Sequence, residues 1–237
     1  MIKDKKSVAI VLSAGSGKRM NSDIPKQYLM LDGKPVIYYA LKTFEDSFID
    51  EIILVCGKGD IEFCSREIVD KYSFRKVKHI VEGGAERYDS VWNGICADND
   101  AEYVFIHDGA RPFVSAEILE RGYEKVKACG ACVVGVPVKD TVKIVNDKGI
   151  VIDTPNRKEV YQIQTPQIFR KSLIEEAYAK LYSLSEQEIE DAAITDDSML
   201  IETFTDSKVS IVMGDYCNFK ITTAEDMLLA KEFVNRG

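Results

Sequence analysis

The stretch Ser7-Val-Ala-Ile-Val-Leu-Ser13-Ala-Gly15-Ser-Gly17-Lys-Arg19-Met20 joins an apolar, β-branched run to a glycine-rich loop. A short apolar run of this kind is typical of a buried strand. The glycines let backbone N–H groups come close to phosphate oxygens. In an open parallel sheet, ligands bind beyond the carboxyl ends of the strands, which is where this loop lies. The stretch therefore predicts a phosphate-binding turn at the end of a first sheet strand.

Two common phosphate motifs do not fit this loop. A Walker A loop needs an earlier glycine and a Ser or Thr after the lysine, but position 12 is Leu and position 19 is Arg. A dinucleotide fingerprint needs a third glycine where Met20 stands, and an acidic partner about 20 residues on. What remains is Gly-x-Gly-x-Arg followed by Pro25-Lys26-Gln27. Two cations in one N–H-rich loop favour a triphosphate, and an ordinary glycine-rich turn with solvated cations is the alternative.

Outward from this loop, strand-like runs alternate with helix-like segments. The expected strands are Ser7–Ser13, Glu51–Cys56, Val77–Val81, Tyr103–His107, Ala131–Val136, Tyr161–Thr165 and Val209–Met213. The expected helices are Val36–Phe44, Ile61–Tyr72, Arg87–Ala97, Ser115–Ala128, Leu173–Leu184, Asp196–Thr203 and Ala224–Asn235. This alternation predicts an α/β fold, a Rossmann-like, mostly parallel sheet with helices on both faces.

One segment breaks the alternation. Thr141–Val145 and Ile150–Thr154 flank the turn Asn146-Asp-Lys-Gly149, which predicts a β-hairpin. We expect residues 138–158 to form a protruding arm, and projecting hairpins commonly reach a second subunit. The chain has no repeat or linker, so we expect residues 1–237 to form a single domain with this one excursion.

Composition narrows the possible classes of protein. The 237 residues are 46% hydrophobic and 30% charged, which excludes a disordered chain. The net charge is −8 and the isoelectric point about 5.0, so we expect no nucleic-acid partner. No apolar run is long enough to span a membrane and no signal peptide is visible, so we expect a cytoplasmic protein.

The six cysteines are expected to be free thiols. Cys129 and Cys132 have the spacing of a redox motif, but their position between a helix and an apolar run favours two buried thiols. No Cys/His cluster has the spacing of a structural zinc site.

Five segments together carry a family resemblance. They are the loop with Pro25-Lys26-Gln27-Tyr28, Gly83-Gly-Ala-Glu-Arg-Tyr-Asp-Ser-Val91, His107-Asp-Gly-Ala-Arg-Pro112, Gln164-Thr-Pro-Gln167 and Asn218-Phe-Lys-Ile-Thr222. In this order the chain resembles the 2-C-methyl-D-erythritol 4-phosphate cytidylyltransferases, from about Val8 to Phe233. It departs from the family at Ser13 and Gly109, where the family usually has alanine.

The resemblance implies a reaction and a set of partners. A phosphate oxygen of 2-C-methyl-D-erythritol 4-phosphate attacks the α-phosphorus of CTP, pyrophosphate leaves, and a precursor of non-mevalonate isoprenoid synthesis forms. The nucleophile is already an anion, so positioning and charge stabilisation replace a general base. The resemblance also implies Mg²⁺ or another divalent cation, a homodimer built through the hairpin arm, and no membrane partner.

The resemblance also assigns roles to residues. The implied catalytic cations are Arg19, Lys26, Arg157 and Lys220. The implied nucleotide-binding residues are Ser13, Ala14, Gly15, Ser16, Gly17, Gly83, Gly84, Ser90 and Gly109. The implied acceptor-binding residues are Asp108, Thr141, Arg157, Thr165, Thr195 and Lys220, with Asp108 also as the metal ligand. We expect His107 to be a packed strand-end residue, and Arg87 and Arg111 to be structural or locally paired.

Two other functions would share part of this sequence pattern. A D-ribitol-5-phosphate cytidylyltransferase shares the fold, CTP and most motifs, but Ile194-Thr-Asp-Asp-Ser198 resembles the element of the methylerythritol enzymes. A non-catalytic nucleotide-binding regulator would be expected to lose Lys26, Asp108 or Lys220, and all three are present.

Overall fold

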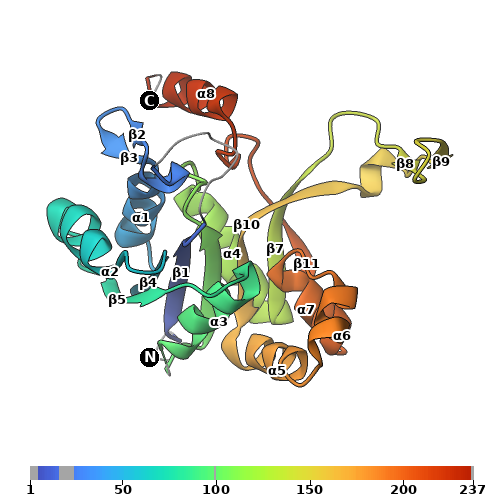
Figure 1. Ribbon diagram of the computed structural model, residues 1–237, viewed down its shortest axis with the longest axis horizontal. Helices are drawn as coiled ribbons and strands as arrows, with labels where there is room; N and C mark the ends of the chain where they lie inside the picture. The colour runs from blue at the N-terminus through green and yellow to red at the C-terminus, as the bar shows by residue number, and fades with distance from the viewer. Residues whose placement is uncertain (1–4, 16–23, 99, 236–237) are drawn as a thin grey trace.

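The structure, a computed structural model, describes residues 5–15, 24–98 and 100–235 (Figure 1). Three of the expected site residues lie outside these ranges, namely Ser16 and Gly17 of the nucleotide-binding set and the catalytic Arg19.

A seven-stranded sheet forms the centre of the molecule, in the order β11-β7-β10-β6-β1-β4-β5. Its strands are β1 (Ser7–Ser13), β4 (Glu51–Cys56), β5 (Val77–Glu82), β6 (Tyr103–Asp108), β7 (Ala131–Pro137), β10 (Tyr161–Arg170) and β11 (Ser210–Met213). All neighbours pair in parallel except β10, which runs antiparallel to both β6 and β7. The predicted mostly parallel sheet is confirmed.

Helices cover both faces of the sheet (Figure 1). The helices are α1 (Val36–Asp46), α2 (Ile61–Phe63), α3 (Arg87–Cys96), α4 (Ala116–Cys129), α5 (Lys171–Leu181), α6 (Glu186–Ala192), α7 (Asp197–Phe204) and α8 (Ala224–Val234). Helices α1 and α4 pack on one face, and α3, α5 and α7 on the other. A third, smaller apolar cluster joins α8 to β2 (Met30–Leu31) and the start of α1.

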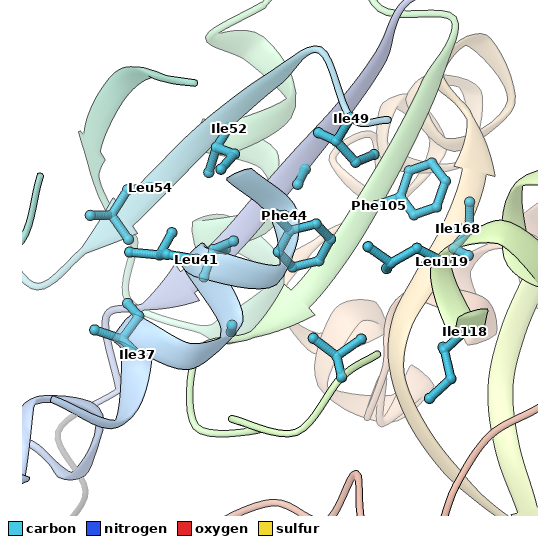
Figure 2. Packing of buried hydrophobic residues seen from close by; sticks show 14 of the residues in the cluster. Ile37, Leu41, Phe44, Ile49, Ile52, Leu54, Phe105, Ile118, Leu119 and Ile168 are labelled. Carbon is cyan, nitrogen blue, oxygen red and sulfur yellow. The ribbon is translucent and has the colours of Figure 1, made fainter. Parts of the chain in front are cut away.

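The period-two alternation of the strands explains this double coverage. In β1, Ala9 and Val11 belong to the cluster under α1 and α4, whereas Val8 and Ile10 belong to the cluster under α3, α5 and α7. Figure 2 shows the first of these clusters, with Phe44 of α1 packed beside side chains of the sheet. Full burial of each large apolar side chain contributes about 1.5–3 kcal/mol, so both faces stabilise the fold.

Three local features differ from the sequence prediction. Strand β10 continues past Pro166 to Arg170, with a register irregularity between Ile163 and Gln167. The predicted helix 61–72 divides into the short α2 and a π-helical segment, Cys64–Asp70. Helix α6 was not predicted, because it has no buried residue and therefore no apolar stripe.

The predicted hairpin is present, with shorter strands than expected. It consists of β8 (Ile144–Val145) and β9 (Val151–Asp153), and it projects from the body of the molecule (Figure 1). Its turn is closed by Asn146, whose Oδ1 accepts hydrogen bonds from two backbone N–H groups at 3.0 Å. Its apolar side chains are exposed, namely Ile144, Val145, Ile150, Val151 and Ile152.

The two cysteines with redox-motif spacing differ from each other. Cys132 is buried in the core, as expected, but Cys129 at the end of α4 is only half-buried. The Cys129 Sγ lies 3.1 Å from the backbone carbonyls of both Lys125 and Ala131, between which its one S–H is shared, and both cysteines are free thiols. The expectation of two buried thiols is therefore correct for Cys132 and wrong for Cys129.

Candidate active site

A cavity of about 460 Å³ opens at the carboxyl ends of β1 and β6. This is the end at which open α/β sheets bind ligands, and the volume suits a nucleotide-sized molecule. Its lining residues are Leu12, Ser13, Ala14, Gly15, Lys26, Gln27, Gly84, Ala85, Glu86, Arg87, Ser90, Asp108, Ala110 and Lys220.

The loop after β1 is fastened to the segment that carries Lys26. A short 3-10 helix, Lys26–Tyr28, places Lys26 on the cavity wall and buries Gln27. The Gln27 side-chain amide donates to the backbone carbonyls of Ser13 and Gly15. The described part of the loop and Lys26 are therefore held in one fixed arrangement.

Ser13, one of the two departures from the family pattern, makes its own contacts beneath the loop. Its hydroxyl donates to the Val55 carbonyl at 2.9 Å, so it is left to accept from the Tyr28 hydroxyl at 3.2 Å. The Cys64 thiol lies 3.1 Å from the same tyrosine oxygen. This hydrogen-bonded chain ties the loop to β4 and to the π-helical segment.

A second part of the cavity wall is built by the glycine pair before α3. The Gly83 N–H donates to the Cys56 carbonyl at 2.8 Å, and the Gly84 N–H donates to the Ser90 hydroxyl at 3.1 Å. Gly84 and Ser90 line the cavity, whereas Gly83 lies behind the lining. Position 83 has no room for a side chain, because a Cβ there would lie 2.5 Å from the Ala14 Cβ.

Gly83→Ala is expected to impair nucleotide use without unfolding the chain. Its methyl group would push the Ala14 loop away from the wall that carries Ser90. A displacement of about 1 Å in a positioned site can cost about 100-fold, so kcat/KM for CTP should fall to that extent. The matched control is Gly57→Ala, whose methyl group would meet only the side chain of Asp60. Equal kcat/KM values in steady-state assays of both variants would contradict this account of the wall.

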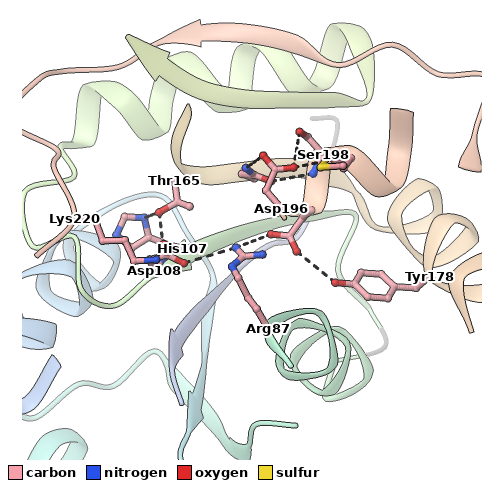
Figure 3. A network of polar contacts seen from close by, with 11 residues as sticks. Arg87, His107, Asp108, Thr165, Tyr178, Asp196, Ser198 and Lys220 are labelled. Carbon is pink, nitrogen blue, oxygen red and sulfur yellow. Dashed lines mark hydrogen bonds and ion pairs between the residues drawn. The ribbon is translucent and has the colours of Figure 1, made fainter. Parts of the chain in front are cut away.

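Among the described residues, four charged side chains form a connected group, and three of them, Arg87, Asp108 and Lys220, line the cavity (Figure 3). The Lys220 Nζ lies 2.7 Å from Asp108 Oδ2, and Arg87 Nη2 lies 3.6 Å from Asp108 Oδ1. Arg87 Nη2 also pairs with Asp197 Oδ2 at 2.8 Å. Burial alone would raise the pKa of Asp108, but Arg87 and Lys220 more than offset it and hold that pKa well below its usual range. Asp108 is therefore a carboxylate throughout the physiological pH range.

A chain of hydrogen bonds fixes the backbone at Asp108. The Asp108 N–H donates to the Thr165 hydroxyl at 3.0 Å, and that hydroxyl lies 3.1 Å from His107 Nδ1. His107 Nε2 lies 3.1 Å from the Arg111 carbonyl and must donate to it, so Nδ1 accepts from Thr165. Burial lowers the pKa of His107 to about 4, which keeps the ring neutral. His107 is a packed strand-end residue, as predicted.

Several expected site residues lie outside the lining of this cavity. The Thr165 hydroxyl is buried and bonds within the chain, so it supports Asp108. Gly109 is also behind the lining, where its N–H donates to the Leu12 carbonyl at 2.8 Å. The remaining three are exposed, with Thr141 and Arg157 in the arm segment and Thr195 before α7. Within one chain, these three do not meet the cavity.

The sequence did not identify two members of the charged group. Arg87 was expected to be structural or locally paired, and it is paired, but it also lines the cavity, and its partner Asp197 was not singled out. The available signals were the position of Arg87 between the glycine pair and Ser90, and the two consecutive aspartates that begin α7. Neither signal reveals that residues 110 positions apart form an ion pair.

The carboxylates in the cavity fit a divalent cation that is coordinated mainly by the phosphates of the substrate. Within the described ranges, no group of three or more His, Cys, Asp or Glu side chains is placed to hold a metal. Two carboxylates of the described residues, Asp108 and Glu86, line the cavity, and Glu86 is already used as the N-cap of α3. From the residues that the structure describes, Asp108 Oδ1 has only the long contact to Arg87. One carboxylate plus substrate phosphates is the donor set that Mg²⁺ prefers.

Comparisons with known proteins find similar sequences and a similar fold. The family model described as 2-C-methyl-D-erythritol 4-phosphate cytidylyltransferase matches residues 7–236. A protein of that name from Lachnospira eligens is 50% identical over 96% of this chain and 99% of its own. One from Lachnoclostridium phytofermentans is 48% identical, over 96% and 95%. The crystal structure of 4-diphosphocytidyl-2C-methyl-D-erythritol synthase from Anaerococcus prevotii is 39% identical, covers 98% of this chain and 97% of its own, and superposes with a TM-score of 0.85.

Proposed function

The chain belongs to the 2-C-methyl-D-erythritol 4-phosphate cytidylyltransferase family, and from this premise we propose how its residues carry out the reaction. The enzyme transfers CMP from CTP to 2-C-methyl-D-erythritol 4-phosphate in isoprenoid synthesis. The products are pyrophosphate and 4-diphosphocytidyl-2-C-methyl-D-erythritol. The observation that carries the assignment of residues is one cavity lined by Lys26, by the loop after β1 and by the Asp108–Lys220 pair.

Lys26 and Arg19 are proposed to stabilise the charge that develops during the transfer. A phosphate oxygen of the acceptor forms a bond to the α-phosphorus of CTP, and the bond from that phosphorus to the bridging oxygen of the β-phosphate breaks. Negative charge grows on the leaving pyrophosphate, and fixed cations are most effective where charge develops. The place of Lys26 beside the loop supports its role, while the role of Arg19 stays a prediction.

The loop and the glycine wall are proposed to hold the nucleotide. Ser13, Ala14 and Gly15 line the cavity together with Gly84 and Ser90. Backbone N–H and C=O groups at a glycine can approach the edge of a pyrimidine closely. The roles of Ser16 and Gly17 in this loop also stay predictions.

The acceptor is proposed to bind where Lys220 and Asp108 meet. Lys220 is 35% exposed, and it would align the acceptor's phosphate for attack. Thr165 contributes indirectly by holding the Asp108 backbone. The role of Thr195 near the acceptor stays a prediction.

A second chain is proposed to complete the site through the arm. A single hairpin is only marginally stable in water, and this one exposes its apolar side chains. Packing against the same arm of another copy in a two-fold homodimer would bury them. We propose a single domain with this arm at residues 138–158, and that the arm brings Thr141 and Arg157 to the partner's acceptor.

A divalent cation is proposed to bind with the triphosphate. Asp108 would hold it through Oδ1, and the cation would supply charge neutralisation on the phosphate oxygens.

Among the described residues, no helix is long and apolar enough to cross a membrane. Localisation in the cytoplasm stays a prediction from the sequence.

Asp108→Asn is expected to abolish turnover or to shift its dependence on Mg²⁺ to much higher concentration. An amide has nearly the same shape as the carboxylate but no charge to attract a cation. The measurement is pyrophosphate release as Mg²⁺ is titrated, with thermal unfolding recorded beside it. An active variant with an unchanged Mg²⁺ titration would assign the metal to other ligands.

The proposed function is tested by pyrophosphate release from CTP, UTP, ATP and GTP, each with and without 2-C-methyl-D-erythritol 4-phosphate. We expect release that needs both CTP and the acceptor. Release from purine nucleotides at similar rates would contradict the proposed nucleotide wall. Nucleotide binding without any release would instead favour the regulator.

A further inference from the structure

Arg87 contacts two carboxylates that come from different parts of the fold. It is the first residue of α3, directly after the wall that is proposed to hold the nucleotide. Its Nη2 lies 2.8 Å from Asp197 at the start of α7 and 3.6 Å from Asp108 at the end of β6 (Figure 3). A capping box between Glu86 and Asp89 fixes this first turn of α3. The guanidinium therefore extends from a rigid position.

Asp197 is an anchor and does not line the cavity. Its side chain is 1% exposed, and the Tyr178 hydroxyl donates to Oδ1 at 3.3 Å while Arg87 pairs with Oδ2. A buried carboxylate of this kind is costly without a partner. Any effect of Asp197 on the reaction must therefore be transmitted through Arg87.

The charges alternate along the group, in the order Lys220, Asp108, Arg87, Asp197. The contact of Arg87 with Asp197 is shorter than its contact with Asp108, and Asp108 lies closest to Lys220 at 2.7 Å. Asp197 thus holds the guanidinium back from Asp108. Without that anchor, we expect Arg87 to move toward Asp108 and to compete with Lys220 for its carboxylate.

We propose that Arg87, anchored by the buried Asp197, is a positioning residue that sets the geometry of Asp108 and Lys220 for CMP transfer. This inference rests on the proposed function of the cavity. A guanidinium suits the task because its planar fork can contact two carboxylates, whereas an ammonium is a point charge. The pair also connects the start of α3 to the start of α7, so these two helices share one support.

Two simpler roles predict different results. If Arg87 only contacted a substrate phosphate, replacing Asp197 would leave turnover almost unchanged. If the pair only held α7 in place, its loss would lower the melting temperature without changing the kcat of the folded enzyme. A positioning role instead predicts that replacing either Arg87 or Asp197 lowers the kcat of the folded protein.

The test is a double-mutant cycle with the full chain, CTP, Mg²⁺ and 2-C-methyl-D-erythritol 4-phosphate. The variants are Asp197→Asn, Arg87→Met and the double variant. The double variant removes both charges of the ion pair, so neither is buried without its partner. Each single change should lower kcat about 10- to 100-fold, as for other residues that orient a functional group, with little change in KM for CTP. The double variant should be no worse than Arg87→Met, because both changes remove one shared function.

Controls separate the possible failures. Arg66→Met removes an exposed arginine paired with Glu62 at 3.4 Å, and it should keep the wild-type kcat. Arg87→Lys keeps a cation beside Asp197, so it should fold, yet it should still lose kcat. Wild-type kcat in folded Asp197→Asn or Arg87→Lys, or effects that multiply in the double variant, would overturn the inference. An inactive wild-type chain in the same assay would instead contradict the proposed function.

Discussion

Lys26→Ala is expected to lower kcat about 100- to 1000-fold, the usual cost of removing one fixed group that stabilises charge in a transition state. Lys26 lines the cavity beside the loop that is proposed to hold the triphosphate. Charge grows on the leaving pyrophosphate only as the bond breaks. The loss should therefore appear in kcat far more than in the affinity for the acceptor.

The measurement is steady-state turnover with the acceptor varied at saturating CTP. Lys58→Ala is the matched control, because Lys58 is exposed and lies outside the cavity lining. It should keep the wild-type kcat. A Lys26→Ala enzyme with near-normal kcat would remove this lysine from the mechanism.

Mixing two inactive variants, Arg157→Ala and Lys26→Ala, is expected to restore activity. If Arg157 acts on the partner's acceptor, a heterodimer has one site with both lesions and one site with neither. After complete exchange of equal amounts, half of the dimers are heterodimers, so about a quarter of all sites should be intact. Activity should therefore rise from almost none toward about a quarter of the wild-type value, in line with the two-fold arrangement.

A matched mixture shows whether the recovery has this cause. Lys26 and Lys220 line the same cavity of one chain, so a mixture of Lys26→Ala with Lys220→Ala leaves one lesion in every site. That mixture should stay inactive under the same exchange conditions. If the Arg157→Ala and Lys26→Ala mixture is also inactive after demonstrated exchange, Arg157 works within its own chain or not at all.

The sequence predicted the sheet and most helices because burial on both faces leaves continuous apolar runs, as in Glu51–Cys56. It could not predict that β10 runs antiparallel, because strand direction depends on how the chain crosses between distant elements. Pro166 also made the expected strand too short, since the register irregularity that accommodates it follows from pairing with β7.

The site was predicted in part. Lys26, Asp108 and Lys220 were singled out from separate segments, and the fold brings them to one cavity. Thr165 was expected to face the acceptor, but it bonds to His107 and to the Asp108 backbone, an orientation that the register of β10 sets. The pairing of Arg87 with Asp197 depends on where α3 and α7 lie relative to each other, which no local pattern reveals.

The most direct test of the account is a competition between two acceptors. The enzyme is supplied with CTP, Mg²⁺ and equal concentrations of 2-C-methyl-D-erythritol 4-phosphate and D-ribitol 5-phosphate. The two CDP-linked products differ by one oxygen atom, so mass spectrometry of the early reaction mixture measures both at once. We expect the methylerythritol product to predominate, with one pyrophosphate released per product. A predominance of CDP-ribitol would contradict 2-C-methyl-D-erythritol 4-phosphate as the acceptor.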